Sequence, residues 1–276
     1  MLALVTVAAG VLGLLIGSFL GVVIDRVPAG ASILAPPSAC DACGHRIRWY
    51  DNVPVVSWLV LRGRCRDCGA PIGARHPLTE LGTGLAFAAV ALGLAPDGLL
   101  PAPARLPDAA QWLVLLAFLL FAACGIALAI IDAELRRLPT PIIVTGVVGV
   151  AVLLAGTAAI RGDLGSVLTS LGASLAMGAI FLVIALIRPD GMGLGDVRLA
   201  VLIGLVTGWV GWSTAVLAFL SAFLLGALAG LGVLLARRGD RRTAIPFGPW
   251  MLAGAWLGIG LGPLAWAWYG GILGLA

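Results

Sequence analysis

Two aspartates stand where apolar sequence gives way to polar sequence. Asp132 follows directly after the apolar run in GIALAIIDAELRRLP, and Asp196 lies in the glycine-rich segment GMGLGDVRLA. Two carboxylates close enough to share a proton can activate one water molecule. Three glycines, Gly191, Gly193 and Gly195, would allow the loop to bring Asp196 close to its partner or to an extended substrate backbone. Either aspartate alone would more often be a solvated loop charge, but together they predict an aspartic dyad.

Four cysteines form a second group of residues whose types and spacing could perform chemistry. They occur as Cys40-x2-Cys43 and Cys65-x2-Cys68, with 21 residues between the pairs, in the polar turns CDACGHR and CRDCGAP. Two such turns supply four thiolates, which is a complete tetrahedral set for zinc. A closed site of this kind has no open coordination position, so its expected role is to fold a small insertion. The alternatives are two reducible disulfides or free thiols.

The remaining polar candidates rank lower. His45 and His76 are surplus to the metal set, and Cys124 reads as a small buried hydrophobe. Glu80 is either a functional polar group or a partner for Arg75. Acidic residues expected to be structural or solvated are Asp97, Asp108, Glu134, Asp163 and Asp190.

The composition of the chain indicates which structural elements position the aspartates and cysteines. Of 276 residues, 61% are hydrophobic and only 11% are charged, whereas a soluble domain carries about 25% charged residues. Eight apolar stretches are each near the roughly 20 residues that cross a bilayer, the sixth being short. They are Leu2–Ile24, Leu78–Leu94, Ala110–Ile131, Pro141–Ile160, Leu164–Ile187, Val197–Trp212, Ser213–Ala236 and Phe247–Ile272. The sequence therefore predicts an all-α polytopic membrane protein.

The expected organisation has three parts. Residues 1–24 form the first transmembrane helix, residues 25–77 a four-cysteine zinc-binding insertion, and residues 78–276 a seven-helix membrane core. Glycines recur at every fourth position in the first and last helices, a spacing that lets helices approach closely. These glycines are Gly13, Gly17, Gly21, Gly254, Gly258 and Gly262.

The distribution of arginine between the loops predicts how the chain is oriented in the membrane. All 17 basic residues are arginine, and with eight spans 15 of them fall on one side of the membrane, while only Arg105 and Arg161 fall on the other. Basic loops remain in the cytoplasm. Both termini are therefore expected outside, and the insertion and both aspartates at the cytoplasmic face. The net charge of +4 is explained by this distribution, so the lipid bilayer is an expected partner and nucleic acid is not.

Several segments together resemble the bacterial type IV prepilin peptidases, which are bifunctional leader peptidases and N-methyltransferases. They are GSFLGVVIDRVP (17–28), DNVPVVSWLVLRGRCRDCG (51–69), RHPLTE (75–80), IIDAELRRLP (130–139), GMGLGDVRL (191–199) and IPFGP (245–249). The resemblance implies a GxGD-type intramembrane aspartic peptidase of the bacterial plasma membrane, with Asp132 and Asp196 as the catalytic residues. Its substrates would be prepilins or pseudopilins with a hydrophobic N-terminal helix, cut at the cytoplasmic face. The resemblance also implies methylation of the new N-terminus from S-adenosylmethionine.

Four positions depart from the pattern of this family. Gly21 stands where Asn is usual, His76 where Tyr is common, Thr140 where Asp is common, and Arg198 where Lys is common. Gly21 and His76 lie in the region tied to methylation, and no glycine-rich nucleotide loop on a strand–helix unit accompanies them. Arg198 follows Asp196 closely and would support its negative charge.

Two other classes of protein are compatible with part of this pattern. An ion-coupled transporter would also have eight helices with glycine-rich breaks and buried acids, but its acids belong near the midplane of the membrane. A non-enzymatic zinc-bearing assembly factor would need the cysteines and neither aspartate.

Overall fold

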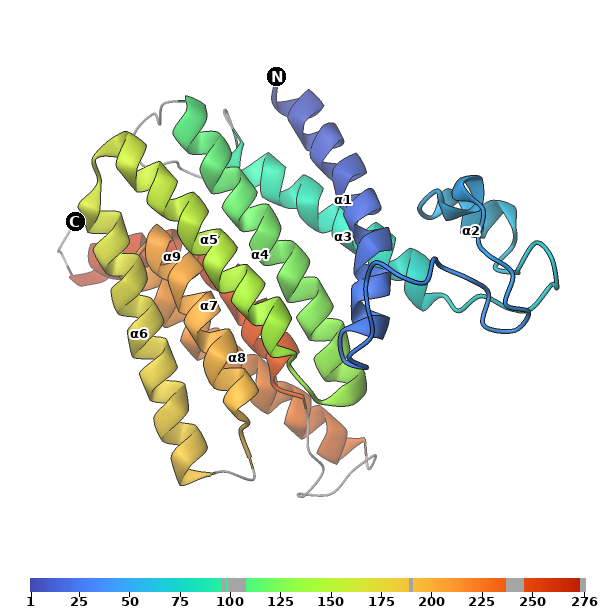
Figure 1. Ribbon diagram of the computed structural model, residues 1–276. Coiled ribbons are helices and arrows are strands. Elements are labelled where there is room, and N and C mark those ends of the chain that lie inside the picture. Colours follow the sequence, from blue (N-terminus) through green and yellow to red (C-terminus); the bar gives the residue numbers. More distant parts are fainter. Residues whose placement is uncertain (96–97, 99–107, 189–190, 237–245, 274–276) are drawn as a thin grey trace. The chain divides into compact units, whose positions relative to one another are not determined.

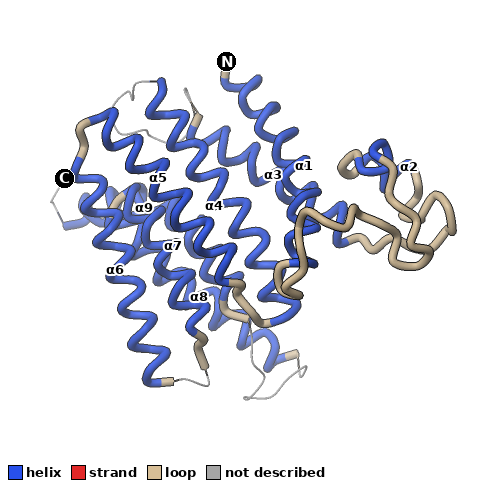
Figure 2. The backbone as a smooth tube through the Cα atoms, in the orientation of Figure 1, coloured by secondary structure: helices blue, strands red, loops and turns tan. Residues whose placement is uncertain are grey.

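The computed structural model describes residues 1–95, 98, 108–188, 191–236 and 246–273, and this part of the chain contains helices and no β-strand (Figures 1 and 2). The helices are α1 (Leu2–Arg26), η1 (Trp49–Asn52), α2 (Val56–Val60), α3 (Arg75–Leu94), α4 (Asp108–Leu135), α5 (Thr140–Arg161), α6 (Leu164–Ile187), α7 (Leu194–Val210), α8 (Trp212–Leu235) and α9 (Gly248–Leu273). The predicted all-α class is confirmed. Residues Asp97, Arg105, Asp190, Arg237, Arg238, Arg241, Arg242 and Ile245 lie outside the described residues.

Seven of these helices are long and apolar enough to cross a membrane, as judged by length and composition: α1, α3, α4, α5, α6, α8 and α9. The short sixth stretch expected from sequence is α7, which has 17 residues. Large apolar side chains point outward along these helices; Leu175 of α6 and Leu220 of α8, for example, are 73% and 56% exposed. Such surfaces fit an integral membrane protein.

The chain divides into two units, Met1–Ala127 and Leu128–Ala276, with the boundary inside α4. In the first unit, α1 packs along α3. A Cβ atom on Gly13 would lie 2.7 Å from the carbonyl oxygen of Thr83, and one on Gly17 would lie 2.6 Å from Cα of Glu80. The two backbones touch because neither glycine has a side chain, which confirms the expected packing role for these two, whereas a Cβ atom on Gly21 would lie 3.4 Å from the His76 side chain.

In the second unit, α7 contacts α5, α6, α8 and α9, so this short helix is the centre of the unit. A Cβ atom on Gly204 would lie 2.6 Å from Cα of Ser174 on α6. Two hydroxyls of α6 donate hydrogen bonds to carbonyl oxygens of α7: Ser170 to Leu205 at 2.6 Å and Ser174 to Val201 at 2.8 Å. Small residues and hydroxyls therefore join the two helices in place of large apolar side chains.

Helices α8 and α9 pack through the second predicted glycine stripe. A Cβ atom on Gly254 would lie 2.6 Å from the backbone nitrogen of Ala222, and one on Gly258 would lie 2.6 Å from the carbonyl oxygen of Thr214. Gly262 also faces the backbone of Thr214. The packing role expected for this stripe is confirmed.

We predict that Gly204→Leu destabilises the second unit, because the new side chain has no space between α6 and α7. Overpacking of this kind costs about 1–3 kcal/mol, which should lower the thermal unfolding midpoint of the purified protein in detergent by several degrees. The matched control is Gly232→Leu on α8, where an added Cβ would meet no atom within 4 Å. Equal midpoints for the two variants would contradict the proposed tight packing.

Candidate functional site

Asp132 lies in the last turn of α4, and its side chain is buried at 5% exposure. One carboxylate oxygen, Oδ2, accepts a hydrogen bond from the backbone N–H of Gly248 at 2.9 Å. Gly248 is the first residue of α9, so this N–H has no acceptor inside its own helix. A Cβ atom at Gly248 would lie 2.8 Å from the same oxygen. The glycine is therefore required by the approach of the carboxylate.

Asp196 lies in the first turn of α7 and is half-buried. Its Oδ2 accepts the backbone N–H of Gly193 at 3.0 Å, which caps the helix. The three glycines of this loop were expected to provide conformational freedom, but none of them has a positive φ. Gly195 is needed for space, because a Cβ atom there would lie 2.9 Å from Cβ of Leu138.

Leu138 joins the segments that carry the two aspartates. Its Cδ1 atom lies 3.4 Å from the position of a Cβ atom on Gly195, and its Cδ2 atom lies 3.4 Å from that on Gly248. The end of α4, the start of α7 and the start of α9 therefore meet around one leucine. The carboxylates of Asp132 and Asp196 are close enough to interact electrostatically. The structure thus brings together the two residues that the sequence singles out.

Arg198 connects the start of α7 to the start of α5. Its guanidinium donates a hydrogen bond to the hydroxyl of Thr140 at 2.8 Å, across 58 positions of sequence. Both positions depart from the family pattern noted above, and they contact each other. Sequence reasoning assigned Arg198 to the support of Asp196 but did not find Thr140 as its partner.

The four cysteines gather in the first unit. Their Sγ atoms all lie within 4.8 Å of one another, and those of Cys40 and Cys68 are 3.8 Å apart. With Zn–S bonds of about 2.3 Å, a tetrahedron has sulfur–sulfur edges of about 3.8 Å. No disulfide joins any of the four. The cluster could therefore hold a zinc ion, and the disulfide alternative is not what the structure adopts.

The two cysteine turns have the same backbone hydrogen bonds. Gly44 N–H bonds to the carbonyl of Cys40 at 2.8 Å, and Gly69 N–H bonds to that of Cys65 at 2.9 Å. The two glycines have φ values of +70° and +71°. Glycine adopts this conformation without steric cost, so each turn presents its thiols in the same way.

The thiols of the cluster differ in how readily they lose their protons. Backbone N–H groups of Cys43 and Ala42 lower the pKa of Cys40 to about 7. For Cys68, the N–H of Ala70 acts in the same direction, but desolvation and the neighbouring thiols outweigh it and raise the pKa to about 12. The thiolate of Cys40 therefore forms more readily than that of Cys68, and a bound cation would favour both.

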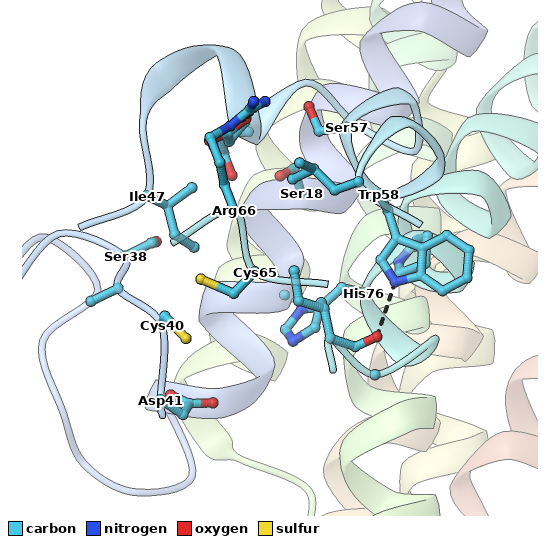
Figure 3. A pocket seen from close by; sticks show the side chains of 18 of the residues that line it. Ser18, Ser38, Cys40, Asp41, Ile47, Ser57, Trp58, Cys65, Arg66 and His76 are labelled. Carbon is cyan, nitrogen blue, oxygen red and sulfur yellow. Dashed lines mark hydrogen bonds and ion pairs between the residues drawn. The ribbon is translucent and has the colours of Figure 1, made fainter. Parts of the chain in front are cut away.

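The first unit also contains a cavity of about 450 Å³ (Figure 3). It is lined by the C-terminal end of α1, the cysteine turns, α2 and the N-terminal end of α3. His76 lines it, as does Glu80, which accepts the backbone N–H of Val55 at 2.7 Å. Sequence reasoning singled out Glu80, His76 and Gly21 separately, and the structure places all three in the lining of this cavity. Cys124 is buried in α4, as expected.

Fold and site together define a polytopic helical membrane protein with a four-thiol metal cluster and a pair of adjacent carboxylates. Residues 11–94 match the family described as Bacterial Peptidase A24 N-terminal domain, and residues 113–231 match the Type IV leader peptidase family. The chain is 33% identical to a prepilin leader peptidase/N-methyltransferase of Aeromonas hydrophila, with 93% of this chain and 90% of the relative covered.

Relatives with the same description from Pseudomonas putida and Burkholderia pseudomallei (strain 1026b) are 32% and 35% identical. They cover 91% and 88% of this chain, and the chain covers 88% and 81% of them, respectively. No solved structure matches the chain. The chain belongs to the prepilin leader peptidase/N-methyltransferase family, and it is a peptidase.

We predict about one zinc ion per chain in protein purified without chelators. Replacing Cys40 and Cys43 by Ser should remove the metal, because two thiolates do not complete a tetrahedral site. Limited proteolysis within residues 25–77 should then become faster. The control is Cys124→Ala, which leaves the four ligands intact. Metal analysis finding no zinc in the native protein would refute the site.

We further predict that Thr140→Val slows peptide cleavage several-fold, because Arg198 loses its acceptor and the start of α7 is held less firmly. Arg198→Lys should retain more activity than Arg198→Ala, since a lysine can still reach a hydroxyl. Thr140→Ser, which retains the acceptor, is the control. Equal cleavage rates for Thr140→Val and Thr140→Ser would show that this hydrogen bond does not contribute to catalysis.

Proposed function

We propose that this chain removes the leader peptide from prepilins or pseudopilins and that Asp132 and Asp196 perform the hydrolysis. One observation supports this most directly: the two carboxylates, 64 positions apart in sequence, lie near each other at the ends of two apolar helices. The family membership and the descriptions of the relatives support the substrate class.

Hydrolysis by this pair requires one ionised and one protonated carboxyl group. The ionised group removes a proton from water as the water attacks the peptide carbonyl, and the protonated group stabilises the oxyanion and then protonates the leaving amine. Asp196 is assigned as the ionised base, because it lies at the positive end of the α7 dipole. Asp132 lies at the negative end of α4 and is assigned as the acid.

The site is proposed to face the cytoplasm, with both termini outside. The distribution of arginine supports this orientation: Arg136 and Arg137 lie one turn after Asp132, and Arg188 and Arg198 lie on either side of Asp196 in the sequence. In the first unit, α1 ends at Arg26 and α3 begins at Arg75, so an arginine stands at each junction with the cysteine-containing segment. A substrate cut at this face would present its apolar N-terminal helix from the bilayer.

We also propose the second activity, N-methylation of the new N-terminal residue. The relatives are described as both leader peptidases and N-methyltransferases. When bound, S-adenosylmethionine supplies a methyl group attached to a positively charged sulfur. A cavity of about 450 Å³ is within the range of roughly 300–1,000 Å³ typical of small-molecule sites, and the half-buried carboxylate of Glu80 in its lining suits a cationic ligand.

Mutation tests the proposed dyad against the two other classes weighed from sequence, a transporter and a zinc-bearing assembly factor. Asp132→Asn and Asp196→Asn should each abolish cleavage of a prepilin, since neither the base nor the acid is dispensable. The matched control is Glu134→Gln, an exposed position two residues from Asp132 on the same helix, which should still cleave. Substrate and product are resolved on a gel.

Thermal unfolding and zinc content should be unchanged in the two Asp→Asn variants, so that loss of cleavage reports on chemistry. Normal processing by either Asp→Asn variant would refute the dyad. Normal processing by both would favour a function in which neither aspartate cleaves the substrate, and a loss of assembly in the Cys40→Ser variant would then favour the assembly factor.

A further inference from the structure

The short helix α2 turns its polar side inward. Ser57 is buried, and its hydroxyl donates a hydrogen bond to the carbonyl oxygen of Tyr50 at 2.9 Å. Trp58 is half-buried, and its indole N–H donates a hydrogen bond to the carbonyl oxygen of Ile72 at 3.0 Å (Figure 3). These two bonds fix which side of the helix faces the cysteine turns and the cavity.

The opposite side of α2 is apolar and uncovered. Val56, Leu59 and Val60 share one face of the helix, because residues three and four positions apart lie above one another. Their exposed fractions lie between 55% and 69%, and we call these three residues the α2 face. Two exposed neighbours along the chain, Val53 and Trp49, add to the apolar surface of the segment. Exposed apolar side chains gathered in this way indicate a surface that a partner covers.

The start of α2 is attached to a helix that is long and apolar enough to cross a membrane. Oε2 of Glu80 on α3 accepts the backbone N–H of Val55, the residue before α2, at 2.7 Å. At 1.5 Å per residue, Glu80 lies about 8 Å along α3 from the first residue of that helix. Leu78 and Leu81, close to Glu80 in the sequence, are exposed. The lipid-facing surface of α3 therefore begins at the level where α2 is attached.

The attachment is well defined. Val55 has φ +61°, a conformation that a β-branched residue adopts only when the surrounding structure holds it. The backbone N–H of Val56 bonds to the carbonyl of Pro54 at 2.6 Å, which closes a tight turn directly before the helix. The bond between Glu80 and Val55 maintains this turn, so the α2 face stays close to the end of α3.

Two exposed arginines follow α2, and neither has an acidic partner among the residues that the structure describes. The described ion pairs between residues 25 and 77 are made by other arginines, in the pairs Arg48–Asp51, Arg48–Asp67, Arg66–Asp51 and Arg75–Asp25. Arg62 and Arg64 take part in none of them. Arg62 also has φ +52°, a conformation in which glycine is the usual residue after a helix. The backbone therefore does not explain why arginine stands there.

The chemistry of this surface matches a phospholipid bilayer. Aliphatic side chains enter the acyl boundary, tryptophan lies at the level of the headgroups, and arginine holds its guanidinium near the phosphates. Anionic headgroups attract unpaired arginines at the membrane surface. The bilayer is also the partner closest to α2, because α2 is attached where the lipid-facing surface of α3 begins.

We propose that the α2 face docks on the membrane that α1 and α3 cross, and that Arg62 and Arg64 bind anionic phospholipid headgroups. The face enters the boundary between headgroups and acyl chains, while the inward side of α2 holds the cysteine turns. This role is separate from the removal of leader peptides: it holds the four-cysteine segment against the bilayer.

The test uses the full zinc-loaded chain in nanodiscs, with the photoreactive residue p-benzoylphenylalanine in place of Leu59. Illumination joins this side chain to the molecule that it contacts, and mass spectrometry identifies the adduct. In nanodiscs of phosphatidylcholine and phosphatidylglycerol, the main adduct should be a phospholipid. Its yield should fall several-fold when phosphatidylcholine is the only lipid, because the arginines then lose their anionic partners.

Single substitutions test the arginines in the anionic nanodiscs. Arg62→Gln and Arg64→Gln should each lower the yield of the lipid adduct several-fold. Arg62→Gly should do the same, although glycine suits the backbone conformation better, and it separates the charge from the turn. The charge-matched control is Arg46→Gln, an exposed arginine of the first cysteine turn that is also outside those ion pairs. Its yield should not change, and zinc content should be the same in all variants.

Each other adduct overturns the proposal and names a different partner. These adducts would join Leu59 to residues 128–276, to a second copy of the chain or to an added prepilin. Reaction with water alone would show that the face is not covered, which overturns the proposal as well. So does a lipid adduct whose yield depends neither on phosphatidylglycerol nor on the two arginines. Cleavage is not measured, so the outcome is independent of the proposed peptidase activity.

Discussion

A carboxyl group at the end of an apolar helix needs a hydrogen-bond donor from the protein itself, because little water reaches it. In this chain the donor for Asp132 is the first N–H of α9, at Gly248. That contact sets where α9 begins and requires glycine at the position. It also leaves the space that Leu138 fills, and Leu138 packs on Gly195 directly before Asp196. The placement of the second carboxylate therefore depends on how the first one is satisfied.

Much of the fold could be predicted from sequence, because a membrane imposes length and composition on each helix. The expected stretch Leu164–Ile187 coincides with α6, and the glycine stripes of the first and last helices do pack. The boundaries differ most at α7, which begins at Leu194, whereas the apolar stretch begins at Val197. The difference arises because Asp196 caps the helix and so belongs to its first turn.

The cysteine cluster was predictable for a different reason. Ligand spacing within each turn is local, and the glycine after each pair satisfies a local backbone requirement. The contacts that complete the other sites are not local. Arg198 reaches Thr140 across 58 positions, Glu80 reaches Val55 across 25, and Asp132 reaches Gly248 across 116. Such partners depend on how helices are arranged, which periodicity and composition do not determine.

The serine bonds between α6 and α7 have a mechanical consequence. Because hydroxyls of Ser170 and Ser174 bind carbonyl oxygens along α7, the two helices form one stiff block. Separating α6 from α7 would break both bonds. In the short link between α4 and α5, Arg136 has φ +53°, and the side chain of Leu138 lies beside both Gly195 and Gly248. A displacement of this link would therefore disturb the surroundings of both carboxylates at once, because Asp132 precedes it and Leu138 lies against the glycine before Asp196.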